Sequence, residues 1–250
     1  MSAALAQILV DANRTRTPVQ YRADLEPAGQ ADCYDIQASV ARDLGASVAG
    51  WKCGIQDGGK IIFGAPIFAS NTRASGEKWN MPKGQSLKIE VEIAIRLGKD
   101  LPPRPNKPYS REEILDATAE IFAGIELVGS RFANVADAPF RARLADNFNQ
   151  AGYVTSKGAT NFAAFDLSKL RSKLWIDGAL VHDAAATHQQ GDPLVVVVAW
   201  ASNQIDRLGG LKAGQFITTG TLNKPPAVDR PALIEIEIEH LGRTSLQIEN

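Results

Sequence analysis

The chain has 250 residues, 44% of them hydrophobic, which is enough for a sizeable core in one large domain or two small ones. Its formal net charge of −1 shows no basic excess and argues against nucleic acid and anionic membrane surfaces as partners. Two cysteines cannot form a disulfide framework or a zinc knuckle, so we expect reduced thiols and a cytoplasmic location.

The beginning of the chain predicts two helices. Residues 1–12 place apolar side chains on one side of an amphipathic helix, in a run too short and too interrupted for a signal peptide or a membrane span. Residues 32–44 repeat apolar side chains at helical spacing, and Gly45 supplies a stop. We therefore expect a helical N-terminal region over residues 1–46.

The next segment changes to a β-like pattern with a lysine at its centre. Residues 47–55 predict a short strand that carries Lys52 among apolar neighbours. The pattern also suits an edge-strand lysine or one that reaches water along its own stem. Residues 56–80 are rich in glycine, asparagine and serine and predict a long loop interrupted by short strands.

Residues 86–97 place Glu90 and Glu92 two positions apart in a strand-forming run, so both carboxylates project from one face. Two interpretations stay open on this pattern: a strand with one wet face, or a carboxylate pair that binds a hard divalent cation. Residues 233–240, LIEIEIEH, alternate even more regularly and most simply expose their glutamates to water. Alternation alone therefore does not single out Glu90 and Glu92.

The rest of the chain mixes helices and strands. A proline-rich connector precedes a helix over 110–122, which opens with a capping box, and residues 124–132 predict a strand with a third carboxylate, Glu126, in an apolar run. We also expect a polar turn and strand over 145–154, a hairpin over 173–181, a buried helix over 192–208 that starts with Asp-Pro at its N-cap, and a strand over 216–221.

Several common kinds of active site are missing from the sequence. It has no G-x-S-x-G elbow, no G-x-G-x-x-G turn and no P-loop. The three histidines, His182, His188 and His240, show no metal-ligand spacing, and we interpret them as surface or packing residues. Carboxylates on two apolar strands and a lysine on a third remain.

Glutamates grouped at low dielectric repel one another unless a divalent cation and a lysine offset their charge, so the residues favour a metal. A cation held by three carboxylates keeps about three positions for water or substrate oxygens, which suits a 2-oxo acid bound through its carboxylate and keto oxygens.

Over nearly its whole length the chain resembles the fumarylacetoacetate hydrolase superfamily, and within it the 2-keto-4-pentenoate hydratase and 4-oxalocrotonate decarboxylase branch. The order and spacing of the landmarks carry the resemblance: CYDIQ at 33–37, GWKCG at 50–54, IEVEIAIRL at 89–97, IELVGSR at 125–131, ADNFNQAGYV at 145–154, GDP at 191–193 and LKAGQFITTGT at 211–221.

Carried over by position, the resemblance implies that Glu90, Glu92 and Glu126 hold Mg²⁺ or Mn²⁺ and that Lys52 is the active-site lysine. Asp146 matches the ADN turn of the family, either as a catalytic residue or as one that orients its neighbours.

Gly220 and Thr221 match the TGT segment that lies against the substrate's carboxylate. The implied fold is α+β, a mixed β-roll over residues 47–250 with the helical N-terminal region, residues 1–46, integrated into it. The family also implies a small 2-oxo acid substrate and a homo-oligomer.

The leading hypothesis is a metal-dependent hydratase of aromatic catabolism, which converts 2-hydroxy-2,4-dienoates into 4-hydroxy-2-oxo acids. A 4-oxalocrotonate-type decarboxylase, an acylpyruvate hydrolase and a non-catalytic relative are the alternatives. One departure bears on them: Ile62 stands before Phe63–Gly64, where hydratase members often carry an acidic residue. This departure favours decarboxylation or another 2-oxo acid activity.

Overall fold

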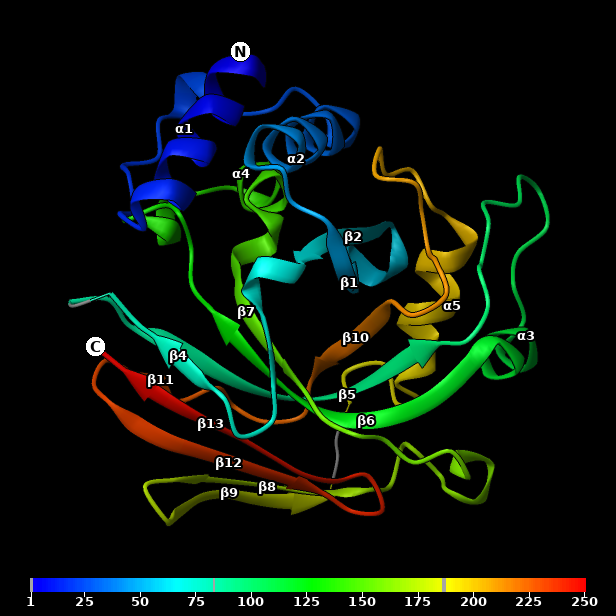
Figure 1. The fold of residues 1–250 in the computed structure, drawn as a ribbon. Coiled ribbons are helices and arrows are strands. Elements are labelled where there is room, and N and C mark those ends of the chain that lie inside the picture. Colours follow the sequence, from blue (N-terminus) through cyan, green and yellow to red (C-terminus); the bar gives the residue numbers. More distant parts are fainter. Residues whose placement is uncertain (1, 83, 186–187) are drawn as a thin grey trace.

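The computed structural model describes residues 2–82, 84–185 and 188–250, which form two β-sheets and five α-helices (Figure 1). The larger sheet has the order β2-β1-β10-β5-β6-β7-β3, with β11 beside β5, and the smaller one the order β4-β13-β12-β8-β9. The helices are α1 (Ser2–Thr15), α2 (Gln30–Leu44), α3 (Arg111–Ala117), α4 (Phe140–Ala145) and α5 (Leu194–Ser202).

The strands of the larger sheet are β1 (Val48–Gln56), β2 (Ile61–Phe68), β3 (Thr72–Ala74), β5 (Leu87–Leu97), β6 (Thr118–Val128), β7 (Gln150–Thr155), β10 (Phe216–Thr221) and β11 (Ala227–Val228). Those of the smaller sheet are β4 (Lys78–Asn80), β8 (Arg171–Ile176), β9 (Ala179–Ala185), β12 (Ala232–Ile238) and β13 (Gly242–Glu249).

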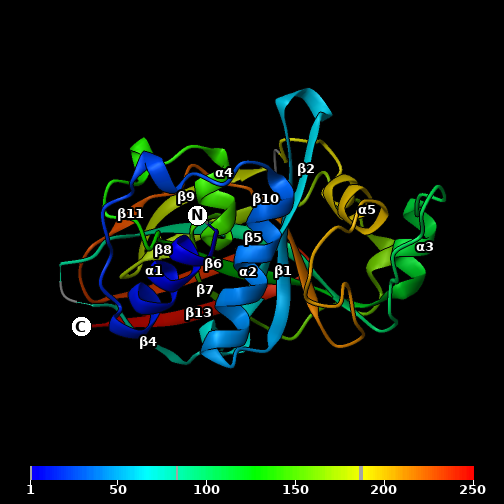
Figure 2. The same cartoon turned by 90° about the horizontal axis from the view of Figure 1, so that it is seen from above.

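The larger sheet is strongly curled, with α1, α2 and α4 on one side of it and the smaller sheet on the other (Figure 1). Seen from above, α2 and α5 lie on either side of β1 and β2 (Figure 2). Apolar side chains of α1, α2, α5 and both sheets belong to one hydrophobic cluster. A much smaller cluster, formed by Ile67, Ala94, Phe122, Tyr153 and Phe216, is separate from it.

Alternation along β12 has the expected result. Ile234, Ile236 and Ile238 are buried, whereas Glu235 and Glu237 between them are partly exposed. The expected hairpin is also present, because Asp177 and Gly178 both adopt positive φ in the turn between β8 and β9.

No helix in the described ranges has the length and apolar character needed to cross a membrane.

The prediction of a long loop interrupted by short strands over residues 56–80 is only partly correct. Strands β3 and β4 are short, but β2 is a regular strand of eight residues. Its glycines suggested a loop, yet Gly64 lies inside β2, where a Cβ would overlap the ring of Trp200 on α5. Gly64 therefore serves close packing between a strand and a helix.

Two predicted helices are shorter than expected. The capping box at Ser110 and Glu113 is present, but α3 ends at Ala117 because the following residues pair with β5 as the start of β6. Helix α5 covers only Leu194–Ser202 of the expected 192–208, and Asp192 precedes its N-cap, accepting a hydrogen bond from the Leu194 amide at 3.0 Å.

Candidate metal centre

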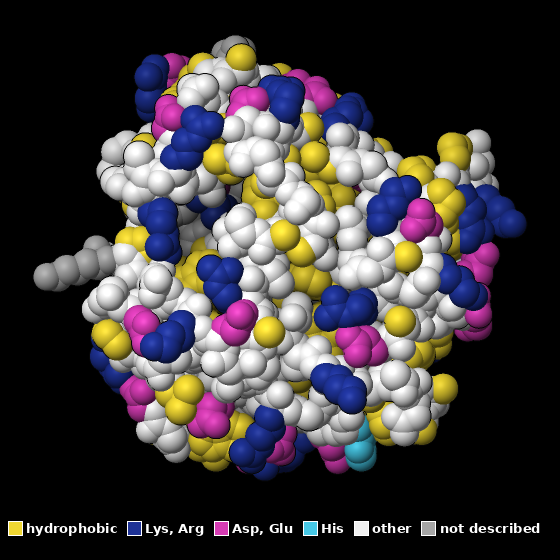
Figure 3. Space-filling model, viewed as in Figure 1, with side chains coloured by type: hydrophobic (Ala, Val, Ile, Leu, Met, Phe, Trp, Pro, Cys, Tyr) yellow, Lys and Arg dark blue, Asp and Glu magenta, His cyan; other side chains and the backbone are white. Residues whose placement is uncertain are grey.

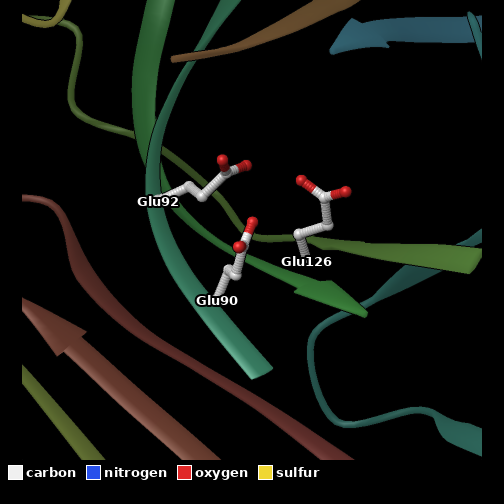
Figure 4. Close-up of side chains that lie close together, drawn as sticks. All are labelled: Glu90, Glu92 and Glu126. Atoms are coloured by element: carbon white, nitrogen blue, oxygen red, sulfur yellow. The ribbon is translucent and has the colours of Figure 1, made fainter. Parts of the chain in front are cut away.

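Three glutamates meet on one face of the larger sheet (Figure 4). Strands β5 and β6 are antiparallel, and their register places Glu90 opposite Glu126 and Glu92 opposite Gly124. One carboxylate oxygen from each glutamate lies within 4.8 Å of the other two. Glu92 and Glu126 have no exposed surface, unlike the glutamates of β12. A strand face turned to water therefore does not describe β5.

Lys52 of β1 extends to this cluster. Its Nζ lies 2.7 Å from Glu126 Oε1 and 3.9 Å from Glu90 Oε2. Strand β1 lies between β2 and β10, so Lys52 is not an edge-strand lysine. Burial alone would lower the pKa of Lys52, but Glu126, Glu90 and Glu92 outweigh it and raise this pKa, so the lysine is protonated at neutral pH.

The charges of the cluster do not balance. Three carboxylates and one ammonium carry a formal charge of −2 in total. Burial raises the pKa of Glu92 well above its usual value, and Glu126 and Glu90 add to this; burial also raises the pKa of Glu126 to about 7, although Lys52 opposes it. Within the part of the chain that the structure describes, both oxygens of Glu92 and Oε2 of Glu126 lack a hydrogen-bond partner.

Buried carboxylate oxygens without partners are costly, and a divalent cation would neutralise the charge of this cluster. All three glutamate ligands are oxygens, the donor type that Mg²⁺ and Mn²⁺ prefer. The residues present therefore fit such an ion.

Two hydroxyl groups beside Glu92 were not predicted from the sequence. Tyr153 of β7 lies opposite Glu126 in register, and its hydroxyl occupies the space where Gly124 lacks a side chain. The hydroxyls of Tyr153 and Thr218 are buried and, among the described residues, make no hydrogen bond of normal geometry. Both nevertheless lie close enough to interact with Glu92: Thr218 opposes the burial that raises the pKa of Glu92, and burial together with the Glu92 charge raises the pKa of Tyr153. The ADNFNQAGYV landmark contains Tyr153, but only the β6–β7 register reveals its place.

Asp146 lies in a different network. Its carboxylate forms an ion pair with Arg131 and accepts hydrogen bonds from the Ser130 hydroxyl at 2.8 Å and the Arg131 amide at 2.9 Å. Arg131 also donates to the carbonyls of Asp146 and Gln150, each at 2.6 Å. Asp146 therefore contacts neither Lys52 nor the glutamates, and Arg131 is the partner that the sequence did not reveal.

The turn after Asp146 brings an aromatic ring to the centre. Asn147, Phe148 and Asn149 have φ of 48°, 53° and 61°, three left-handed residues in succession. The ring centre of Phe148 lies 5.6 Å from Lys52 Nζ and 4.3 Å from the ring centre of Phe63. The Arg131–Asp146 pair thus fixes the base of a turn that forms part of the wall beside Lys52.

Gly220 and Thr221 end β10 beside the glutamates, with Thr221 opposite Glu92 in register. The Thr221 hydroxyl donates to Asn223 Oδ1 at 2.8 Å. Gly220 has φ of 110° and lies against the ring of His188, which bonds the Thr219 carbonyl at 2.6 Å. His188 is a packing histidine, as the sequence indicated.

Ile62 points away from the centre. Strand β2 pairs Ala65 with Lys52 and Ile62 with Ile55, so alternation places the Ile62 side chain on the face opposite to Lys52. In this structure an acidic side chain at position 62 would not face the glutamates. The Ile62 departure therefore argues less strongly against hydration than the sequence suggested.

Comparison with known proteins identifies the family. A model described as fumarylacetoacetate (FAA) hydrolase C-terminal matches residues 63–249, well over half of the chain. The chain belongs to the fumarylacetoacetate hydrolase family. That match includes β5, β6 and β10, and with them every glutamate of the cluster.

Relatives within the family match almost end to end. A 2-keto-4-pentenoate hydratase of Paraburkholderia phymatum is 31% identical and aligns with 96% of this chain and 94% of its own length. The 2-keto-4-pentenoate hydratase 3 of Pseudomonas putida is 29% identical and aligns with 98% of this chain and 94% of its own length.

Solved structures share the α+β fold of the family. A 4-oxalocrotonate decarboxylase from Pseudomonas putida, complexed with magnesium and adipate, has a TM-score of 0.86 at 22% identity and covers 99% of this chain and 97% of its own. A fumarylpyruvate hydrolase from Pseudomonas aeruginosa, in complex with Mn²⁺ and pyruvate, has a TM-score of 0.56 at 18% identity, with 84% of each chain covered.

Proposed function

We propose that this protein is a metal-dependent lyase that hydrates 2-hydroxy-2,4-dienoates to 4-hydroxy-2-oxo acids. The buried cluster of Glu90, Glu92 and Glu126 beside Lys52 carries the proposal, because it provides a cation site next to one protonated donor. The full-length relatives named 2-keto-4-pentenoate hydratase support this substrate class.

Glu90, Glu92 and Glu126 would hold Mg²⁺ or Mn²⁺, as in the neighbouring structures described with magnesium and Mn²⁺. A bound divalent cation supplies Lewis-acid chemistry, which stabilises the enolate form of a 2-oxo acid. The residues of this chain then orient the substrate and move its protons.

The reaction needs two proton movements. The dienol loses its hydroxyl proton and gains one at the far end of the diene, which gives a conjugated 2-oxo acid. Water then adds its hydroxyl to the distal carbon of the remaining double bond and a proton to the carbon beside the keto group. Lys52, held protonated at 2.7 Å from Glu126, is our candidate for donating a proton or binding the substrate's carboxylate.

The remaining predicted site residues have supporting roles in this proposal. Gly220 and Thr221 end the strand next to Glu92, and we assign them to the substrate's carboxylate. Asp146 is engaged by Arg131 and Ser130, so we assign it the orientation of the turn that carries Phe148 rather than a step of the reaction. Homo-oligomeric assembly and a cytoplasmic location stay predictions from the sequence.

The test offers the purified protein 2-hydroxypenta-2,4-dienoate and, separately, 4-oxalocrotonate, each with Mn²⁺. We expect loss of the diene absorbance with formation of a 4-hydroxy-2-oxo acid and without CO₂. Release of CO₂ from 4-oxalocrotonate together with an unchanged dienoate would instead establish a decarboxylase. Turnover of neither compound would favour an acylpyruvate hydrolase or a non-catalytic relative.

A matched pair of variants tests the cluster itself. Glu126→Gln removes one ligand charge at nearly constant shape, and we expect it to weaken Mn²⁺ binding by at least about tenfold and to abolish turnover. Glu235→Gln changes a partly exposed glutamate of β12 and should leave both properties as they are. Unchanged Mn²⁺ affinity in Glu126→Gln would show that the three-glutamate site is wrong.

A further inference from the structure

A second concave site lies on the opposite face of the larger sheet from the glutamates. It is a cavity of about 330 Å³ between the end of α1, strands β3 and β4, and the neighbouring ends of β5 and β6. Leu87 lines the cavity and lies three positions before Glu90 on β5, so their side chains point to opposite faces of the sheet. Trp79, which also lines the cavity, packs against Gly152. None of the three glutamates lines this cavity.

The charged side chains that line this cavity are all basic. Arg16, Arg73, Lys78 and Arg131 line it, and its described lining includes no aspartate or glutamate. A different hollow over β8 and β12, by contrast, is lined by glutamates as well as by lysine and arginine. Several Lys and Arg side chains are visible on the side of the molecule where α1 lies above β4 (Figure 3).

Two of these cations have no acidic partner in the described part of the chain. The Arg16 guanidinium donates to the Asn80 carbonyl, and that of Arg73 donates to the carbonyls of Ser70 at 3.0 Å and Thr72 at 2.8 Å. Lys78 and Arg131 differ, because Glu249 lies 2.7 Å from the first and Asp146 pairs with the second. The cavity therefore has about two positive charges that no carboxylate offsets.

We propose that this cavity binds a small dianion, whose oxygens accept hydrogen bonds from the guanidinium groups of Arg16 and Arg73. Two guanidinium groups match two negative charges, and their planar forks suit phosphate and carboxylate oxygens alike. Asn71 and Ser130 add neutral polar groups to the wall. A phosphate group and a dicarboxylate share this chemistry, and the volume admits either.

No glutamate of the cluster lines this cavity, and neither does Lys52, although Ser130 and Arg131 in its wall also hold Asp146. At the glutamate cluster three carboxylates share a single ammonium, so no net positive charge is available there to hold an anion. Anion binding to the protein without added divalent metal therefore reports on the cationic cavity. The guanidinium of Arg73 lies 5.3 Å from the ring centre of Trp79, so a ligand at Arg73 also changes the surroundings of a fluorescent side chain.

The experiment titrates inorganic phosphate and, in a second arm, succinate into the full chain at low salt without divalent metal. Calorimetry and tryptophan fluorescence follow binding. We expect saturable binding in at least one arm. The Kd should rise at least tenfold in Arg16→Gln and in Arg73→Gln, and the Kd of the unchanged protein should increase with salt. The tighter arm identifies the preferred oxyanion.

Arg14→Gln is the matched control. Arg14 lies in the last turn of α1, two residues before Arg16, and donates to a backbone carbonyl, that of Asp43 at 2.7 Å, but it does not line the cavity. The Kd of the Arg14→Gln variant should stay within about twofold of the Kd of the unchanged protein. An equal loss in Arg14→Gln would show general attraction to a basic surface and overturn the proposal.

Arg73→Lys controls for folding, because it keeps the positive charge at this position and replaces only the planar guanidinium with an ammonium group. We expect an intermediate loss of binding with an unchanged thermal midpoint. If neither phosphate nor succinate binds saturably up to about 10 mM, the cavity is not an anion site. That result would leave the metal-dependent reaction untouched.

Discussion

Glu92 and Glu126 are both fully buried, but they differ in what compensates their charge. The Lys52 ammonium lies 2.7 Å from Glu126, whereas neither oxygen of Glu92 has a hydrogen-bond partner within the described ranges. A protein that keeps such a group sacrifices stability for a ligand site, as functional sites often do. Whether a substitution raises or lowers the free energy of unfolding can therefore distinguish a metal-binding glutamate from a structural one.

Glu92→Gln should stabilise the protein when no metal is present. Without metal, folding must either bury the Glu92 charge or protonate this carboxyl, and the amide requires neither. We therefore expect the free energy of unfolding to rise by about 1 kcal/mol, while the extra stability that Mn²⁺ gives the unchanged protein disappears. Urea unfolding with and without Mn²⁺ measures both effects. A metal-free variant less stable than the parent would contradict a cost of burying this charge.

His188 is neutral because both ring nitrogens are already committed. Its Nδ1 accepts from the Gln190 amide at 3.2 Å, so its Nε2 must donate to the Thr219 carbonyl. Burial lowers the pKa of His188 below the usual 6.5, although the Thr219 carbonyl opposes this. Protonation therefore favours the unfolded chain.

The stability due to His188 is complete above the unfolded pKa and is lost as pH falls below it. We expect the stability advantage over His188→Gln, measured by urea unfolding, to shrink between pH 7.5 and about 5.5. A difference that stays constant over this range would show that His188 does not titrate as its contacts require.

At the scale of elements, the β6–α4–β7 junction depends on one buried ion pair. Side chains of Arg131 and Asp146 are 11% and 1% exposed, and the guanidinium also binds two carbonyls of the turn. Three left-handed residues follow directly, a strained arrangement that its surroundings must hold in place. The pair links this strain to the position of Phe148 beside Lys52.

Asp146→Asn should destabilise the protein by about 3 kcal/mol, because it leaves the Arg131 charge buried without a partner. Asp35→Asn is the control, since the Asp35–Arg207 pair is about half exposed and its loss should cost less than about 1 kcal/mol. Urea unfolding compares the two variants. Similar losses in both would mean that the junction does not depend on the buried pair.

The sequence predicted the elements whose local pattern agrees with their tertiary surroundings. Strands β5, β10 and β12, the β8–β9 hairpin and the first two helices follow from spacing and turn residues alone. The first residues of β6 were predicted as helix because apolar spacing fitted both structures and only pairing with β5 decides between them. The length of strand β2 was underestimated, because Gly64 suggested a loop although it serves close packing against Trp200.

The same limit applies to the candidate site. The sequence singled out Glu90, Glu92 and Glu126 as carboxylates in apolar strands, the resemblance added Lys52, and the structure brings the four side chains together. Tyr153 and the Arg131–Asp146 pair depend on which strands neighbour each other, and no local pattern encodes that. A charged side chain in an apolar strand can therefore be recognised in the sequence, whereas a contact that depends on how two strands pair cannot.

At the scale of the whole molecule, the N-terminal helices are bound to the rest of the chain by polar as well as apolar contacts. Gln37 Nε2 donates to the Leu144 carbonyl at 2.7 Å, and Gln30 Nε2 donates to the Ile62 carbonyl at the same distance. Tyr34 stacks on Trp200 of α5, with ring centres 5.9 Å apart. These contacts would all be lost if residues 1–46 separated from the rest.

We therefore predict that residues 1–46 and 47–250 unfold in one transition. The chain offers a probe for each region: all four tryptophans lie in 47–250, and Cys33 is a buried free thiol on α2. In a Cys53→Ser variant, thiol reactivity reports only Cys33. Its urea midpoint should coincide with that of tryptophan fluorescence, because shared core packing couples the two regions. Exposure of Cys33 at a lower urea concentration would show two domains.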